Sequence, residues 1–306
     1  MICIKSKDFI LDKKTIVTLG KFDGVHKGHR KLISAAKELA AEHNLPVAVF
    51  TFKVVEGGHF PYMDGAKITT FEERERIFEN LGVDILIEYP FDDSVADMEP
   101  IAFIEHIIKG RMSAEYVVVG EDWTFGKGGA GNTDLLKASQ KLFDFKAVIL
   151  EKELHDGREI GSSWIRDEIM AGRMETANIL LDYPYSVTGT VVHGNLFGRT
   201  MGFPTANLIP DEDKLLPPYG VYAAKVFTVD GEYYGVANIG VKPTVSDKNT
   251  VGVETYIIGY DGDLYGSDIR VELIHFQRPE MKFQSVDMLQ AQLMRDIEFA
   301  KTYFMI

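Results

Sequence analysis

Residues 15–29, TIVTLGKFDGVHKGH, combine an apolar run, a glycine-rich turn and the start of a periodic segment. The run at residues 15–19 is rich in β-branched side chains and predicts a buried strand. Apolar residues then recur at helical spacing: Leu32, Ala35, Ala36, Leu39 and Ala40. The turn between strand and helix contains Gly20, Gly24 and Gly28. These glycines allow close approach of a ligand to the backbone, and the unpaired N–H groups at the helix start favour an anion.

Two histidines add chemistry to this turn. His26 and His29 are three residues apart, so on the first helical turn they project toward the same volume. From there they can donate hydrogen bonds to phosphate oxygens as negative charge builds up in a transition state. The alternative is that the turn only connects the strand to the helix, with one histidine capping and the other solvated. Because Asp23 and three glycines lie within the same ten residues, we expect a nucleotide-phosphate site.

Short β-branched runs alternate with helical patterns from residue 15 to residue 150. This alternation is the βαβ rhythm of a parallel, doubly wound sheet, in which ligands bind at the carboxyl ends of the strands. Further strands are predicted at residues 47–52, 85–89, 116–119 and 147–150, and helices at residues 71–81, 100–109 and 132–143. Two short helices, at about 163–171 and 174–181, close this part of the chain.

The rhythm changes after residues 182–184, Asp-Tyr-Pro. Short strands follow, joined by Gly/Asp turns with no long helix between them, which predicts an antiparallel barrel or sandwich. The predicted strands are residues 185–192, 220–229, 233–239, 254–260 and 269–276. An amphipathic helix at about 285–303 ends the chain. We therefore expect an α/β unit with a doubly wound parallel sheet over residues 1–183, followed by an antiparallel β-barrel with a closing C-terminal helix over residues 184–306.

A second glycine-framed segment, GRTMGFPTAN, occupies residues 198–207. Thr205 and Asn207 are two residues apart, so in an extended segment both side chains point to one face. Their hard oxygens suit Mg²⁺ beside nucleotide phosphates. The alternative is a Pro-Thr turn in which Asn207 satisfies a loop backbone. Two phosphate-binding segments imply two activities.

Composition excludes several other classes of function. The chain has 306 residues, 45% of them hydrophobic, which fits two domains with full cores. The formal charge of −13 divides into −8 before residue 184 (23 basic, 31 acidic) and −5 from there on (10 basic, 15 acidic). Neither part is basic, so we expect no nucleic-acid or anionic-membrane partner. Cys3 is the single cysteine, no zinc-like cluster or signal-peptide core is present, and we expect a cytoplasmic protein.

The first glycine turn resembles the GxFDGxHxGH signature of nucleotidylyltransferases, in the variant carried by the bacterial bifunctional riboflavin kinase/FMN adenylyltransferases (FAD synthetases). Residues 119–127, VGEDWTFGK, are similar to the family's VGxxFxFG segment, and residues 160–166, IGSSWIR, to its (V/I)SSTxIR motif. Residues 198–207 resemble the riboflavin kinase motif that ends in PTAN. Further matches are YGVY at 219–222, GVANIG at 235–240, VETY at 253–256, GDLYG at 262–266 and QRPEMKF at 277–283.

The resemblance implies a nucleotidylyltransferase-like, Rossmann-like first domain and a riboflavin kinase-like barrel. The barrel would convert riboflavin and ATP to FMN and ADP, and the first domain would convert FMN and ATP to FAD and pyrophosphate. ATP is then a co-substrate of both reactions, and Mg²⁺ serves both. Riboflavin, FMN and ATP are the implied small-molecule substrates, and the oligomeric state is left open.

The resemblance also implies site residues. The catalytic residues are Glu254, His26 and His29. The nucleotide-binding residues are Gly20, Phe22, Asp23, Gly24, Gly28, Asp122, Ser162, Ser163, Arg166, Gly198, Arg199 and Gly202. The flavin-binding residues are Phe203, Pro204 and Arg278, and the metal ligands are Thr205 and Asn207. In riboflavin kinases the glutamate matching Glu254 is the base, and a ribityl hydroxyl does need a positioned carboxylate to accept its proton; the alternative is a solvated strand glutamate.

The chain departs from the family pattern mainly after the strand at residues 47–52. The family usually reads TFxPHP there, whereas residues 51–56 of this chain read TFKVVE, without the His-Pro pair. Lys21 stands where the family usually has asparagine, and Gly161 stands where it has the first serine of its motif. Two alternatives follow: a riboflavin kinase with a degenerate first domain that acts as a scaffold or nucleotide sensor, or a non-catalytic regulator that responds to flavin or nucleotide.

Overall fold

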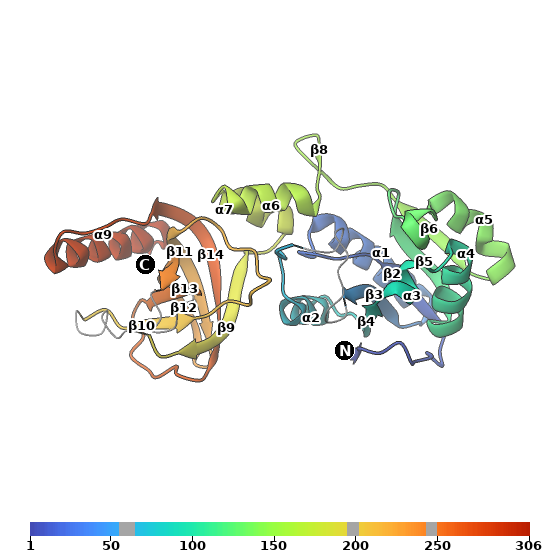
Figure 1. Cartoon of the computed structure of the whole chain (residues 1–306), viewed down its shortest axis with the longest axis horizontal. Helices are drawn as coiled ribbons and strands as arrows, with labels where there is room; N and C mark the ends of the chain where they lie inside the picture. Colours follow the sequence, from blue (N-terminus) through green and yellow to red (C-terminus); the bar gives the residue numbers. More distant parts are fainter. Residues whose placement is uncertain (55–64, 195–201, 243–249) are drawn as a thin grey trace. The chain divides into compact units, whose positions relative to one another are not determined.

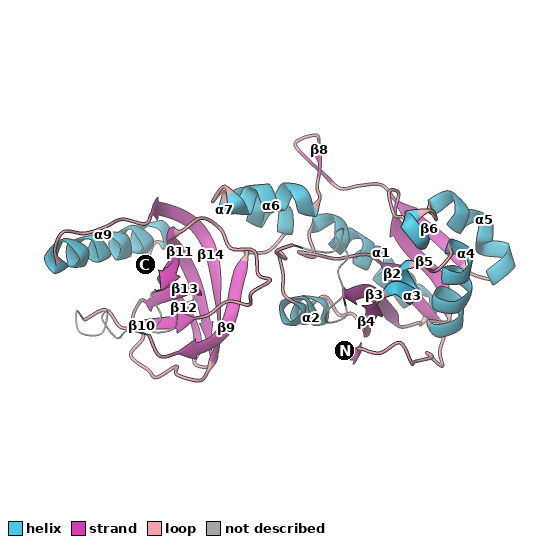
Figure 2. Ribbon diagram, in the orientation of Figure 1, coloured by secondary structure: helices cyan, strands magenta, loops and turns pink. Residues whose placement is uncertain are grey.

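The computed structural model describes residues 1–54, 65–194, 202–242 and 250–306. The chain divides into two compact units, Met1–Gly161 and Ser162–Ile306. In Figures 1 and 2 the first unit is a sheet covered by helices, and the second is a barrel with helices against it. No helix in the described ranges is long and apolar enough to cross a membrane.

In the described part of the first unit, one six-stranded parallel sheet has the order β1-β4-β3-β2-β5-β6. Its strands are β1 (Ile2–Ile4), β2 (Thr15–Leu19), β3 (Val47–Val54), β4 (Ile85–Phe91), β5 (Ala114–Gly120) and β6 (Lys146–Leu150). From β2 the chain moves outward in one direction through β3 and β4, and β5 then lies on the other side of β2. The order therefore reverses between β2 and β5, and the carboxyl ends of these two strands form the position where such sheets bind ligands.

Helices cover both faces of this sheet (Figure 1). The helical elements are α1 (Lys27–His43), α2 (Phe71–Asn80), α3 (Asp93–Ala96), α4 (Pro100–Ala102), the π-helix η1 (Phe103–Arg111), the 3₁₀-helix η2 (Lys127–Gly129) and α5 (Thr133–Phe143). A short hairpin, β7 (Leu154–His155) with β8 (Arg158–Glu159), follows β6. Apolar side chains alternate between the two faces, which confirms the predicted doubly wound sheet: α1 and α2 pack on Ile16, Val49 and Leu86, whereas η1 and α5 pack on Val17, Leu19 and Phe50.

One predicted α-helix is mostly of another type. Apolar residues at 100–109 predicted an α-helix, and the structure has a short α-helix followed by the π-helix η1. The buried side chains of η1 are Phe103, Ile104, Ile107 and Ile108. Their spacing fits one buried face in either helix type, so periodicity alone does not separate the two.

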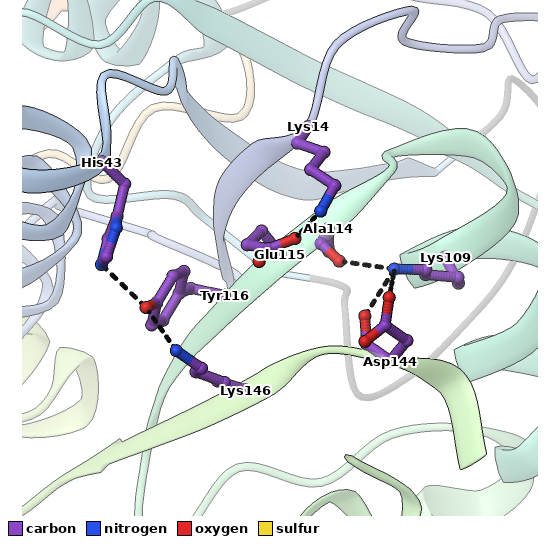
Figure 3. A network of polar contacts seen from close by, with 8 residues as sticks. All are labelled: Lys14, His43, Lys109, Ala114, Glu115, Tyr116, Asp144 and Lys146. Carbon is purple, nitrogen blue, oxygen red and sulfur yellow. Dashed lines mark hydrogen bonds and ion pairs between the residues drawn. The ribbon is translucent and has the colours of Figure 1, made fainter. Parts of the chain in front are cut away.

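A polar network lies at the opposite end of the sheet from the ligand-binding position (Figure 3). The Tyr116 hydroxyl accepts a hydrogen bond from Lys146 Nζ at 2.9 Å and lies 2.7 Å from His43 Nε2. The hydroxyl and the imidazole share a second hydrogen bond, whose direction is set by the His43 tautomer. Lys14 and Glu115 form an ion pair of 2.6 Å beside it. These contacts tie the end of α1 to the starts of β5 and β6.

In the second unit, six antiparallel strands of the described residues close a barrel in the order β10-β13-β12-β11-β14-β9. The strands are β9 (Ser186–Val192), β10 (Thr205–Leu208), β11 (Gly220–Thr228), β12 (Gly231–Lys242), β13 (Thr250–Ile257) and β14 (Asp268–Pro279). The helices are α6 (Ser162–Met170), α7 (Met174–Leu181) and α9 (Val286–Phe304). Val221, Ala223 and Val236 face outward and pack against Ala300 and Ile297 of α9. The predicted barrel and closing helix are confirmed.

Helix α7 packs against the barrel, and α6 packs against α7. Asn178 on α7 donates its amide Nδ2 to Leu273 O at 3.1 Å and accepts the Tyr185 N–H at 2.7 Å. The Phe276 ring lies against Gly172 in the connection between the two helices. The compact units therefore divide at Gly161 and Ser162. The boundary predicted at residues 183 and 184, which concerns the extent of each catalytic domain, stays a prediction.

Candidate functional site

The glycine turn, residues 20–25, leaves β2 in an unusual backbone conformation. Phe22, Gly24 and Val25 all have positive φ, of 50°, 80° and 36°. A β-branched residue in this region is a steric outlier, and Val25 is fully buried. The Val25 N–H closes the turn on Phe22 O at 3.1 Å. Strain of this kind persists only where the surroundings hold it, and it is concentrated at functional sites.

The carbonyl of Lys21 is one point at which the turn is held. It accepts the Thr51 hydroxyl of β3 at 3.1 Å and the Arg74 guanidinium Nη1 of α2 at 2.9 Å. Two elements that lie far apart in the sequence thus meet on one backbone atom. The role of these two side chains was missed at the sequence level.

A second point of attachment explains Asp23. The Gly24 N–H donates to Thr69 Oγ1 at 3.1 Å, and the Thr69 N–H donates to Asp23 Oδ1 at 3.3 Å. Asp23 and Thr69 are both buried. This carboxylate therefore fixes the turn onto the segment before α2, and its role in nucleotide binding stays a prediction.

His26 and His29 lie together as predicted. Their rings stack with centroids 3.7 Å apart and planes at 27°. His26 is the N-cap residue of α1, and its side chain makes no capping hydrogen bond in the described structure. A Cβ on Gly28 would lie 3.2 Å from His26 Cε1, so the absence of a side chain there leaves room for the ring. The Phe22 ring also packs against His29, with ring centroids 5.0 Å apart.

Both imidazoles are held neutral by their surroundings. Burial lowers the pKa of His26 to about 4. Burial also lowers the pKa of His29 well below its ordinary value, and the neighbouring His26 and Arg74 lower it further. Among the described residues, neither buried Nδ1 atom has a hydrogen-bond partner. The first turn of α1 contains no acidic residue, so the neutral rings and the positive helix end offer donors to an anion.

The glycine turn lies beside a second turn at the strand-order reversal. Gly20 follows β2 and Gly120 ends β5, and the two strands pair with Thr18 opposite Val118. Asp122 comes two residues later; its carboxylate, about two-thirds exposed, pairs with Lys152 at 3.2 Å. The structure thus brings Asp122 to the predicted end of the sheet.

Three predicted phosphate-binding residues belong to the other unit. Ser162, Ser163 and Arg166 lie on α6, and the two hydroxyls are in its first turn. Since α6 is part of the second compact unit, their contribution to the site of the first unit stays a prediction.

The second unit has a row of polar residues on one face of the barrel. Asn207 on β10 pairs with Glu254 on β13, and Glu254 pairs with Asn238 on β12. Residues directly opposed in an antiparallel sheet point to the same face. Asn238 is opposite Val221, which packs against α9, so this row faces outward. Asn238 was missed as a site residue, although it lies within the GVANIG match.

Glu254 is linked to the predicted metal ligands. The Thr205 hydroxyl donates to Glu254 Oε1 at 2.7 Å. The Asn207 amide Nδ2 donates to Thr205 O at 3.2 Å, and the amide is covered by Gly194, where a Cβ would lie 2.6 Å from it. Asn207 is buried, which fixes its orientation. Thr205 and Asn207 thus present hard oxygens on one face, a donor pair that fits Mg²⁺, with the Glu254 carboxylate beside them.

The metal site would consist mainly of neutral oxygens. Among the described residues, no group of three or more His, Cys, Asp or Glu is arranged to hold a metal ion. Thr205 and Asn207 are uncharged, so binding of a divalent cation here would depend on the phosphate charges of a nucleotide.

The predicted flavin residues lie in different environments. The Phe203 ring lies 5.7 Å from the Tyr256 ring, and Pro204 beside it is exposed. The Arg278 guanidinium donates to both carboxylate oxygens of Asp296 on α9, at 2.9 and 2.6 Å. Arg278 therefore anchors α9, and its effect on a flavin site would be through the placement of that helix.

Gly202 has a positive φ of 83° just before Phe203. The predicted nucleotide-binding residues Gly198 and Arg199 lie outside the described residues, as does the segment at 55–64 that contains most of the departure from the TFxPHP pattern.

Comparisons with known proteins match two parts of the chain to two family models. The FAD synthetase family model matches residues 9–164, and the riboflavin kinase family model matches residues 181–304. The bifunctional riboflavin kinase/FMN adenylyltransferase of Listeria monocytogenes is 38% identical over 299 residues, covering 96% of this chain and 93% of the relative. The protein of the same name from Bacillus subtilis is also 38% identical, covering 95% and 93%. A crystal structure described as a macrolide-efflux protein from Streptococcus pneumoniae matches with a TM-score of 0.86 at 33% identity, over 98% of each chain.

Proposed function

The chain belongs to the family of bifunctional riboflavin kinases/FMN adenylyltransferases, and we propose how its residues divide the two reactions. The protein phosphorylates riboflavin with ATP to give FMN, and it adenylylates FMN with ATP to give FAD. The barrel carries the first reaction and the parallel-sheet unit carries the second. We place both in the cytoplasm, as predicted from the sequence.

For the kinase, the hydrogen bond between Thr205 Oγ1 and Glu254 supports the assignment most directly. Glu254 accepts the proton of the ribityl primary hydroxyl as the hydroxyl oxygen attacks the γ-phosphorus of ATP. The bond from that phosphorus to the bridging oxygen breaks, and ADP leaves. The Thr205 hydroxyl, at 2.7 Å, holds the carboxylate in place.

Thr205 and Asn207 would hold Mg²⁺ at this face, where the ion would neutralise phosphate charge when bound. Gly202 and the predicted residues Gly198 and Arg199 would complete the nucleotide pocket of the barrel. Phe203 and Pro204 would contact the flavin, while Arg278 would shape its pocket by anchoring α9 through Asp296.

For the adenylyltransferase, the stacked neutral pair His26 and His29 supports the assignment. An FMN phosphate oxygen attacks the α-phosphorus of ATP, the bond to the bridging oxygen breaks, and pyrophosphate leaves. The imidazole donors and the amino end of α1 stabilise the charge that develops on the α-phosphate oxygens. Ser162, Ser163, Arg166 and Asp122 are the further phosphate and nucleotide contacts of this proposal.

The test of the division is a pair of incubations of the full-length protein, resolved by chromatography. Riboflavin with ATP and Mg²⁺ should yield FMN and then FAD, and supplied FMN should yield FAD. A variant with Glu254→Gln should lose only the first reaction, and one with His29→Ala only the second. Loss of both reactions in either folded variant, or of the wrong one, would contradict the division.

A further inference from the structure

Helix α2 begins in a way that fixes the direction of one buried arginine. Thr70 is its N-cap: its hydroxyl accepts the Glu73 N–H at 3.2 Å, and the Glu73 carboxylate accepts the Thr70 N–H at 3.0 Å. This capping box sets the first turn, and the Arg74 N–H continues it by donating to Thr70 O at 3.1 Å. Arg74 is only 4% exposed, so its side chain runs into the protein rather than into solvent.

The guanidinium group of Arg74 contacts the backbone of the glycine turn. Its guanidinium Nη1 donates to Lys21 O at 2.9 Å, and its central carbon lies 4.2 Å above the Phe71 ring centroid. A buried cation is costly unless it is compensated. Glu88 of β4, 1% exposed, interacts with this cation: burial and Glu75 raise the pKa of Glu88, while Lys5, Lys53 and Arg74 lower it. The arginine is therefore built into the interior.

The same arginine acts on His29. The charged or titratable groups that affect this imidazole are His26, from its own helix, and Arg74, from α2. The Phe22 ring also contacts His29, with ring centroids 5.0 Å apart. A positive charge near an imidazole disfavours its protonation. Removal of the guanidinium charge should therefore raise the pKa of His29.

We propose that Arg74 is a positioning residue for FMN adenylylation, acting through the backbone of the glycine turn and through His29. It holds the carbonyl of Lys21, next to the strained Phe22, and so fixes the turn that leads into the histidine pair. Its charge also adds to the effect of burial, which is the main reason that His29 is a neutral donor. This inference rests on the role proposed above for His29.

The experiment compares full-length Arg74→Met, Arg74→Lys and Arg76→Met with the parent. Arg76 is an exposed residue of the same helix, so its variant controls for the loss of a helical arginine. FAD formation from FMN and ATP is measured with kcat and KM separated, FMN formation from riboflavin is the internal reference, and the His29 imidazole is titrated by NMR.

Arg74→Met should lower kcat for FAD formation about tenfold or more, since small misplacements at a reacting centre have effects of this size. KM should change less, kinase activity should stay at the parental level, and the His29 midpoint should rise. Arg74→Lys should restore the midpoint and part of kcat, because it keeps the charge. Arg76→Met should match the parent.

Parental FAD formation by Arg74→Met would overturn the inference. A lowered rate with an unchanged His29 midpoint and no recovery in Arg74→Lys would also overturn it, since that pattern describes a structural residue only. His29→Ala separates the two proposals. If His29→Ala keeps parental FAD formation, the proposed role of His29 fails and this inference falls with it. If His29→Ala loses FAD formation while Arg74→Met does not, only the inference on Arg74 is wrong.

Discussion

The two candidate sites hold their key polar groups in opposite states. In the parallel-sheet unit, His26 is buried and His29 half-buried, both are neutral, and their buried Nδ1 atoms have no partner among the described residues. In the barrel, Glu254 lies on the outer face and already accepts a hydrogen bond from Thr205 at 2.7 Å. The first site leaves two imidazole nitrogens without a partner among the described residues, whereas the second already orients a carboxylate by a hydrogen bond.

The difference follows from the two reactions. Adenylylation attacks an α-phosphate whose charge must be stabilised, so unpaired neutral donors in a buried turn are useful. Riboflavin phosphorylation needs a proton acceptor and aligned phosphates, so a carboxylate held by a neighbouring hydroxyl is useful. His43, at the other end of the parallel sheet, gives the contrast: its Nε2 is paired with Tyr116 (Figure 3). His43 is also exposed, so the two ends of the sheet differ in both the burial and the pairing of their imidazoles.

The largest effect is expected at the barrel. Glu254→Gln keeps the shape of the side chain but cannot accept the ribityl proton, so FMN formation should fall by about 10²- to 10⁴-fold. FAD formation from supplied FMN should stay at the parental rate. Glu232→Gln, an exposed glutamate of β12, is the matched control. FMN production at the parental rate by Glu254→Gln would show that the barrel uses another base.

The histidine pair should give the next largest effect. His29→Ala removes a preorganised donor, so FAD formation from FMN should fall by about 10²-fold. His43→Ala, at the paired end of the sheet, should leave that rate unchanged while lowering thermal stability. The contrast between unpaired and paired histidines would be wrong if the two variants lost FAD formation equally. Chromatographic assays of FAD formation by both variants measure this difference.

The unpaired histidines should also make the first unit sensitive to acid. His26 titrates at about 4 in the folded state and near its ordinary 6.5 when unfolded. Below pH 6.5 the unfolded chain binds the proton first, so stability is fully present above 6.5 and is lost as pH falls toward 4. Between pH 7 and pH 5 this amounts to about 2 kcal/mol, or about 30-fold in the unfolding equilibrium. His29 adds to the loss in the same direction.

Urea unfolding at the two pH values would measure this loss, with Trp123 fluorescence as the probe in a Trp164→Phe background. His26→Asn should reduce the loss by the amount that His26 contributes. An equal loss in that variant would assign the acid sensitivity to other groups.

The barrel should depend on the two helices that precede it. A fragment of residues 162–306 should phosphorylate riboflavin and be more stable than one of residues 184–306, because the shorter fragment lacks both hydrogen bonds of Asn178. Two hydrogen bonds are worth about 2 kcal/mol, apart from the apolar contacts. Thermal unfolding of both fragments, with their kinase rates, makes the comparison. Equal stability would mean that α6 and α7 add nothing to the barrel.

The smallest effect concerns the metal ligands. Thr205→Val with Asn207→Leu removes two neutral oxygens, each worth about 0.5 kcal/mol and together about 1 kcal/mol, so the kinase should need about fivefold more Mg²⁺ for half-maximal rate. Adenylylation of supplied FMN should keep its magnesium dependence. A kinase titration that superimposes on that of the parent would remove Thr205 and Asn207 from the metal site.

Much of this architecture was predictable because it depends on local pattern. The apolar run at residues 15–19 became β2, and the spacing of Thr205 and Asn207 correctly placed them on one face of a strand. The histidine pair was predictable from its spacing alone. Sequence motifs predict structure well where a short segment by itself determines the local geometry.

The features that the sequence analysis did not predict depend on tertiary packing. In the sequence, Arg74 is indistinguishable from an ordinary exposed arginine of a helix. Only the tertiary fold shows that its side chain is buried and donates a hydrogen bond to Lys21 O. Arg278 was predicted at a flavin site, but its partner Asp296 is 18 residues later on α9. The assignment of α6 and α7 to the barrel also depends on contacts with β14, which no local pattern contains.

Val25 gives the glycine turn a consequence for protein engineering. Its φ of 36° would be comfortable for glycine, but its side chain is fully buried in an apolar cluster with Phe22 and Ile33. Val25→Gly would relieve the strain, yet it would leave a cavity and add chain entropy to the unfolded state, so a screen for heat resistance should not recover it. The packing of the core therefore keeps the turn in a conformation that no single substitution at this residue relaxes without loss of stability.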